Sequence, residues 1–351
     1  MQKTIGTKYM KLRKLEQKEH RKTRALWEDV FVEDTKQFLD YYYDVKTADN
    51  EILAMDDEDK IIAMLHLNPY NMRINDEIHP TNYIVAVATD EKYRKRGIMG
   101  QLLKQAMRMM HDRKEPFTFL MPAAEAIYYP YDFRYIYSRN QGEVFGENNG
   151  SDIEIIPAKV EDCGKLAEFA NAYLKEFQVV SYRDEEYYQT LIAEQQSEAG
   201  EVMMIYKQGK LAGLFCYAKG EHFEIREPLF YEETDFLKAV YLLTQAEEEP
   251  VRCIGYGCKK QPIIMARILH LETFFKCIKL QSNVDVYVEL QDDFIEENNG
   301  VFHIMGTAEE GITFVKKEMT ASNECKKMSM GDFTVQIFGK YFPKVFLNEI
   351  V

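Results

Sequence analysis

The stretch from Tyr83 to Gly100, YIVAVATDEKYRKRGIMG, constrains the fold more than any other part of this chain. Residues Tyr83 to Thr89 are β-branched or apolar at almost every position, which is typical of a strand buried on both faces. From Gly97 onward, apolar residues recur every three or four positions, which predicts a helix. A buried strand that runs into a helix through a short polar turn indicates an α/β fold.

The turn between this strand and this helix is basic and contains glycine. The first turn of a helix has backbone N–H groups without intrahelical partners and the positive end of the helix dipole, so it attracts a pair of phosphates. The sequence therefore predicts a pyrophosphate site whose residues are Arg94, Lys95, Arg96, Gly97, Ile98, Met99 and Gly100. The alternative is an ordinary junction of strand and helix with a solvated basic turn.

Length and charge narrow the function classes. A chain of 351 residues with 46% apolar residues is long enough for two or three domains, each with its own core. The 44 Lys and Arg residues are outnumbered by 58 Asp and Glu residues, which gives a net charge of −14. This balance repels nucleic acid and favours small cationic molecules or lysine-bearing peptides as partners.

The cysteines and the apolar runs indicate the compartment. Six cysteines are scattered and none falls in the first 150 residues, which argues against a disulfide framework. Cys253 and Cys258 have no second Cys/His pair at ligand spacing, so no metal site is expected. No apolar run approaches the roughly 20 residues of a membrane span, and the N-terminal residues lack a signal-peptide core. We expect a soluble, cytoplasmic protein without membrane contact.

An internal repeat predicts the domain organisation. Residues Ile52–Leu67 and Met203–Tyr217 each follow the pattern strand, turn, strand, and each is preceded by amphipathic helical sequence, at 26–43 and 160–195. Two copies of one α/β unit are therefore expected.

The two copies differ at the entry to the helix that follows the hairpin. In the second copy, the helical pattern at 236–245 is preceded by Glu232, Glu233 and Asp235 and by no glycine. Acidic residues at a helix entry repel a pyrophosphate, so we expect only the first unit to bind a phosphate-bearing cofactor.

The last part of the chain, from residue 261, has a different pattern of apolar and turn residues. Residues 262–275 are expected to form a helical lead-in, 283–290 an alternating strand, and 295–304 an Asn-Gly turn followed by another strand. This part predicts a small α+β domain. The chain then ends in apolar residues, which suit a tail that is anchored on the protein.

Two families share these motifs. The spacing Arg94-x-x-Gly97 followed by Gly100 resembles motif A of the GNAT acetyltransferases, from which it departs at Met99, where Gly or Ala is usual. The whole arrangement resembles the Eis (enhanced intracellular survival) acetyltransferases. Supporting segments are Trp27, Phe31 and Asp34 in a W-x-x-x-F-x-x-D pattern and IYYPYDFRY from Ile127.

The resemblance implies a mixed α/β (α+β) fold with tandem GNAT-like units and a sterol-carrier-protein-like domain. The implied domains are a GNAT domain at 1–148, a second GNAT-like domain without the cofactor motif at 149–260, and the small domain at 261–351. Acetyl-CoA is the implied co-substrate, with no metal. It would lie along the backbone of Val87, Ala88 and Thr89 and pass the small residues Ala123 and Ala124.

The resemblance also implies catalytic residues for direct attack of an amine on the thioester. Tyr128 would be the general acid, with Tyr129 or Tyr131 as alternatives, although most aromatic residues simply pack. The α-carboxylate of Val351 would be the general base. Its pKa of about 3.5 lies far below that of a lysine-type ammonium at about 10.4, so it would act through water or on an amine whose pKa is lowered. Alternatively, the tail closes the core of the third domain.

Partners follow from the same reasoning. Asp34 and Glu349, together with the negative net charge, are expected to attract the acceptor, a small-molecule or peptide amine. The resemblance implies a homo-oligomer and favours a hexamer. The competing hypothesis is a lipid-binding or small-molecule-binding protein with a vestigial acyltransferase domain.

Overall fold

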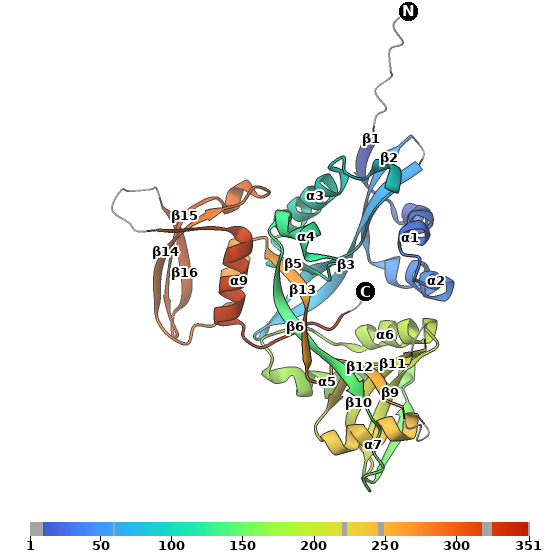
Figure 1. The fold of residues 1–351 in the computed structure, drawn as a ribbon. Coiled ribbons are helices and arrows are strands. Elements are labelled where there is room, and N and C mark those ends of the chain that lie inside the picture. Colours follow the sequence, from blue (N-terminus) through green and yellow to red (C-terminus); the bar gives the residue numbers. More distant parts are fainter. Residues whose placement is uncertain (1–9, 59, 220–222, 245–248, 318–324, 350–351) are drawn as a thin grey trace, which may run out of the picture.

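The computed structural model describes residues 10–58, 60–219, 223–244, 249–317 and 325–349. Within these residues the strands form two sheets, a long one of fourteen strands and a separate one of four (Figure 1). The order along the main path of the long sheet is β1-β2-β3-β4-β5-β13-β6-β12-β11-β10-β9-β7. No helix in the described residues is long and apolar enough to cross a membrane.

The first unit forms one end of the long sheet. Its strands are β1 (Met10–Lys14), β2 (Glu51–Asp57), β3 (Lys60–Ile74), β4 (Glu77–Thr89) and β5 (Phe117–Leu120). Its helices are α1 (Arg24–Val30), α2 (Lys36–Asp44), α3 (Ile98–Asp112) and α4 (Glu125–Tyr128).

The two faces of this unit are covered by different helices (Figure 1). Because side chains alternate along a strand, Leu53 and Met55 of β2 join the core that contains α3. Ile52 and Ala54 instead join the core that contains α1 and α2. The predicted strand at 83–89 is the end of β4, where Tyr83, Ile84 and Ala88 are buried and the other residues are half-buried, and the predicted helix after Gly97 is α3.

The second unit repeats this plan at the other end of the long sheet. Its strands are β7 (Ile153–Pro157), β9 (Glu201–Lys207), β10 (Lys210–Lys219), β11 (Phe223–Phe230) and β12 (Val251–Ile254). Its helices are α5 (Cys163–Tyr173), α6 (Glu185–Ser197) and α7 (Glu233–Leu243). Both predicted hairpins are present, as β2-β3 and β9-β10. The predicted helical segment at 160–195 is interrupted by a short strand, β8 (Val179–Ser181), which pairs with β3.

Two long strands join the units. The strand β6 (Arg134–Val144) pairs with β12 at its end and with β13 (Lys259–Ile268) along most of its length. β13 also pairs with β5, so it lies between β5 and β6 inside the long sheet. The predicted helix at 262–275 is therefore wrong for its first half, and helix α8 (Leu271–Lys276) begins only afterwards. A short apolar run that is buried on both faces cannot be assigned by periodicity alone.

The third unit packs against the first. Its sheet contains β14 (Val284–Gln291), β15 (Gly300–Thr307), β16 (Gly311–Lys317) and β17 (Lys326–Ser329), and the predicted strands at 283–290 and 295–304 correspond to β14 and β15. Helix α9 (Met330–Tyr341) lies between this sheet and the long sheet (Figure 1). Phe338 of α9 contacts Phe117 of β5, with ring centroids 5.5 Å apart. One continuous core therefore joins the first and third units.

The C-terminal tail leaves the third unit and follows the boundary between the other two. Its strand β18 (Val345–Phe346) pairs in parallel with β8. The next residues, Leu347, Asn348 and Glu349, are buried. The described part of the tail is thus anchored, as expected from its apolar sequence.

Candidate active site

A gap between two parallel strands is the first element of the site. β4 and β5 pair only at Tyr83 and Phe119, whereas β4 continues to Thr89 along β3. A bulge at Ala86, which has φ of 49°, inserts one extra residue opposite β3 and bends β4 there. No strand of the described chain pairs with the other edge of β4 after Tyr83, so the backbone of Val87, Ala88 and Thr89 faces the gap.

The start of helix α3 lies beside this gap. Gly97 is the N-cap residue and has φ of +73°, which favours glycine, and a Cβ atom there would meet nothing within 4 Å. Arg94 and Arg96 are exposed and donate hydrogen bonds to the loop carbonyls of Thr89 and Lys92. The first turn of α3 contains no acidic residue. Unpaired amides, exposed cations and open space together form a suitable anion site.

The other predicted cofactor residues differ in exposure. Lys95 is exposed, Met99 and Gly100 are half-buried, and the Ile98 side chain belongs to the core, so Ile98 offers only its backbone amide. Ala123 and Ala124 are exposed between β5 and α4. Lys95 lies in the loop before α3, Ile98 to Gly100 form the first turn of α3, and Ala123 and Ala124 lie in the loop between β5 and α4.

The three candidate tyrosines are separated by burial. Tyr128 is 8% exposed at the end of α4 and contacts Phe133, and burial raises its pKa to about 12. Tyr129 is exposed beneath the guanidinium of Arg134, and Tyr131 packs against Phe294 of the third unit. The Tyr128 phenol is therefore protonated at neutral pH and can donate a proton.

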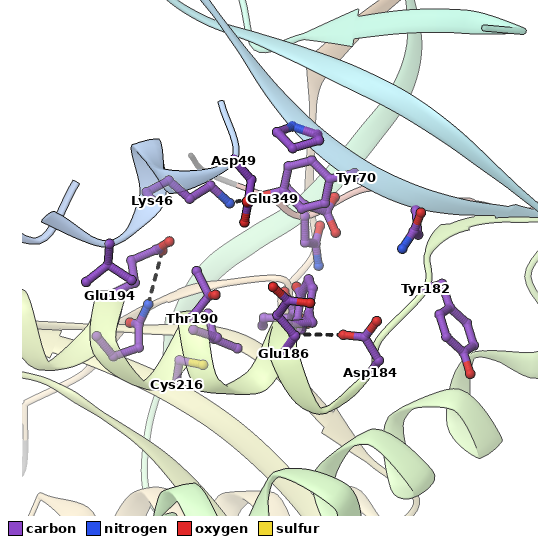
Figure 2. A pocket seen from close by; sticks show the side chains of 18 of the residues that line it. Lys46, Asp49, Tyr70, Tyr182, Asp184, Glu186, Thr190, Glu194, Cys216 and Glu349 are labelled. Carbon is purple, nitrogen blue, oxygen red and sulfur yellow. Dashed lines mark hydrogen bonds between the residues drawn. The ribbon is translucent and has the colours of Figure 1, made fainter. Parts of the chain in front are cut away.

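A cavity of about 450 Å³ lies between the first and second units. Figure 2 shows Lys46 and Tyr70, from the first unit, facing Glu186, Thr190 and Glu194 of α6 across it. The tail adds Asn348 and Glu349, and β6 adds Arg139. Tyr83 of β4 is buried and does not line the cavity; burial raises the pKa of its phenol, and the charges of Glu349 and Tyr128 act in the same direction.

Acidic groups dominate the cavity wall. Its carboxylates are Asp49, Asp184, Glu186, Glu194, Glu227 and Glu349, and its cations are Lys46, Arg139 and Arg226. Burial raises the pKa of Glu194 to about 7, although Lys46 partly offsets this effect. Burial also raises the pKa of Glu349, which the nearby Arg183 lowers in part. Such shifts are frequent where a protein binds or transforms a charged ligand.

The predicted substrate and catalytic residues are placed differently. Glu349 lines the cavity, but Asp34 does not: its carboxylate accepts a hydrogen bond of 2.7 Å from the Trp27 indole and so holds α1 to the following loop. Val351 lies outside the described residues. Sequence reasoning missed Arg139 and Glu194, because nothing in the local pattern around a single charged residue distinguishes a cavity wall from a solvated face.

The N-terminal part of the chain is similar to a known protein family. Residues 11–136 match the family model of the acetyltransferase (GNAT) domain. The chain therefore carries a GNAT acetyltransferase domain, and the gap and the α3 entry both lie in the matched segment.

Solved structures resemble the chain over nearly its whole length, at low identity. A probable N-acyltransferase of unknown function from Enterococcus faecalis has a TM-score of 0.78 and 14% identity, covering 93% of this chain and 89% of the other. A GCN5-related N-acetyltransferase from Anabaena variabilis has a TM-score of 0.76 and 14% identity, with 95% and 91% covered. Eis1 from Mycobacterium abscessus has a TM-score of 0.66 and 10% identity, with 95% and 89% covered. A comparison with curated proteins finds none that matches this sequence.

Proposed function

We propose that this protein is an acetyl-CoA-dependent N-acetyltransferase that acts on a primary amine. The observation that carries the proposal is the unpaired edge of β4 beside the open, basic entry of α3. The backbone of Val87 to Thr89 would bind the extended arm of acetyl-CoA in the manner of a neighbouring strand. The amides after Gly97, with Arg94 and Arg96, would bind the pyrophosphate.

The amine would reach the thioester from the cavity and attack its carbonyl carbon directly. A backbone N–H near Val87 would stabilise the developing oxyanion, a contribution of about 3 kcal/mol in comparable sites. As the C–S bond breaks, the Tyr128 phenol would donate its proton to the leaving thiolate. Its position after β5 supports this role. Burial keeps the phenol protonated but raises its pKa to about 12, so the site must favour the transfer to the thiolate.

The general base in this proposal is the α-carboxylate of Val351, as the resemblance to the Eis acetyltransferases implies. The described tail supports it, because Asn348 and Glu349 line the cavity. The proton would pass through water, or the attacking amine would lose it readily because a buried site lowers the pKa of an ammonium group.

The same resemblance extends the proposal to the rest of the molecule. We propose that the third unit is sterol-carrier-like, that the three domains meet near residues 148 and 260, and that a cytoplasmic homo-oligomer is the working form. Light scattering after size-exclusion chromatography measures the assembly. A monomer at working concentration would contradict this part alone.

Two measurements test the central proposal. Calorimetric titration with acetyl-CoA should detect one site per chain, and thiol release should depend on an added amine from a panel of polyamines, aminoglycosides and lysine peptides. Titration with a fatty acid tests the competing lipid-binding hypothesis. Absence of acetyl-CoA binding at millimolar concentration would contradict the proposed function.

A further inference from the structure

Arg139 is a buried cation for which residues 10–349, in their described parts, provide no hydrogen-bond partner at Nε or Nη1. It lies on β6 in the cavity wall and is 7% exposed. Within the described chain, it also forms no ion pair. A buried guanidinium whose N–H groups lack partners is unfavourable, so the residue is suited to an anionic group that arrives with a ligand.

The two carboxylates whose charges act on Arg139 are already paired with other arginines. Glu227 and Glu224 act on Arg139 through space. Glu227 forms a buried ion pair with Arg183, and Glu224 accepts a hydrogen bond of 2.6 Å from Arg226. Neither carboxylate is therefore free to neutralise Arg139.

A buried acid, Glu349, lies in the same cavity, with the charge of Arg183 nearby. Both side-chain oxygens of Glu349 are buried and have no hydrogen-bond partner among the described residues. Arg139 and Glu349 both influence the pKa of two phenols, Tyr83 and Tyr137, in opposite directions. Tyr137 also donates a hydrogen bond of 3.0 Å to Asn348, the neighbour of Glu349. This bond holds the tail residues against β6, the strand that carries Arg139, so the same cavity wall offers a cation without a described partner and a buried acid.

We infer that the acceptor is a zwitterion, an amine that also carries a carboxylate, with this carboxylate on Arg139 and its amine side toward Glu349. The inference rests on the proposed function and names the substrate class of that site. A cavity of about 450 Å³ accommodates a free amino acid or a short peptide. A singly charged carboxylate suits this wall better than a phosphate dianion, because six acidic residues and three basic residues line it.

The reaction conserves the carboxylate and changes only the amine. The ammonium first loses one proton to the base, and the neutral nitrogen then forms a bond to the acetyl carbon. As the C–S bond breaks, Tyr128 protonates the thiolate, and the second proton lost by the nitrogen restores the Tyr128 phenol through water. Arg139 is a substrate-binding residue in this scheme and takes no part in proton transfer.

Matched pairs of amines test the inference. Lysine and cadaverine differ only in the carboxylate, as do ornithine and putrescine, and glycyl-lysine is compared with its C-terminal amide. For the wild-type protein, kcat/KM should be about tenfold or more higher for the carboxylate-bearing member, as expected for a charge-assisted hydrogen bond in a buried site. In Arg139→Met the ratio should fall to about one. Arg252→Met, which removes an exposed arginine outside the cavity wall, is the matched control and should keep the wild-type ratio.

A stability measurement separates ligand binding from a structural role. Arg139→Met should melt at a higher temperature than the wild type, because the substitution removes a buried charge that no protein group compensates. A lower melting temperature would assign Arg139 to the fold and overturn the inference. Equal turnover of the paired amines, or faster turnover of phosphoethanolamine than of the carboxylate-bearing amines, would overturn it while acetyl transfer stands. Failure of every amine to release thiol would overturn the proposed function as well.

Discussion

The Tyr131 hydroxyl lies over Gly100 in the first turn of α3, so closely that a Cβ atom at Gly100 would come within 2.7 Å of it. Gly100 was predicted as a residue that contacts the cofactor, and the structure shows that it also makes room for a tyrosine. Tyr131 in turn packs against Phe294, with ring centroids 5.6 Å apart. The entry of α3 is therefore coupled to the third unit through one aromatic ring.

Gly100→Ala should destabilise the protein by about 1–2 kcal/mol, because the new methyl group collides with Tyr131. In a Tyr131→Ala background the same substitution should stabilise the protein by up to about 1 kcal/mol, since Ala is the better helix former. Denaturant unfolding of the four proteins in this cycle measures the reversal. An equal effect of Gly100→Ala in both backgrounds would refute the proposed contact.

Tyr128→Phe should lower kcat at least about tenfold, the low end of what general acid catalysis contributes, and leave acetyl-CoA affinity nearly unchanged. Steady-state thiol release and calorimetry measure the two quantities. Tyr129→Phe is the matched control, because Tyr129 is exposed beside it and should retain the wild-type rate. A wild-type kcat for Tyr128→Phe would move the general acid to another residue.

Glu194 should make the stability of the fold depend on pH. Burial raises its pKa from 4.5 to about 7, so the folded protein binds this proton more readily than the unfolded chain does. The contribution of Glu194 to the free energy of unfolding is on the order of 3 kcal/mol. It is fully present below about pH 4.5 and is lost as pH rises through about 7. Glu194→Gln should remove that loss.

Chemical denaturation at pH 5 and pH 8 measures this effect as the difference between wild type and variant. The stability of Glu194→Gln relative to the wild type should be greater at pH 8 than at pH 5. Glu186 is an exposed acid on the same helix, so Glu186→Gln should show no such difference. If the free energy of unfolding of Glu194→Gln changed between pH 5 and pH 8 by the same amount as that of the wild type, the Glu194 carboxyl would not be the group that titrates.

One added residue after Val351 should abolish turnover and leave acetyl-CoA binding nearly intact, if the α-carboxylate of Val351 is the base. The same residue added before Met1 is the control. The buried path of Leu347 to Glu349 implies that an extension disturbs the cavity rather than the α3 entry. Unchanged turnover of the extended protein would remove this carboxylate from the mechanism.

The sequence determined those strands and helices whose formation depends only on residues close together in the chain. Alternation and helical period predicted β4, α3 and both hairpins, because burial of one face requires that periodicity. The α3 entry was predicted for the same reason, since unpaired amides and a basic turn are properties of a short segment. The strand β13 was not predicted as such, because its apolar run is compatible with a helix until β5 and β6 are known to flank it.

The cavity proposed for the acceptor was decided by the tertiary structure alone. Lys46, Arg139, Glu194 and Glu349 come from four distant segments, and each is an ordinary surface-type residue in the sequence. Their unusual properties arise from desolvation and, at Arg139, from missing partners, and both depend on what the folded chain packs around a charge. The sequence by itself determined the GNAT-like scaffold and the anion-binding helix entry; only packing between the units decided which charges are buried, because burial is a property of the whole fold.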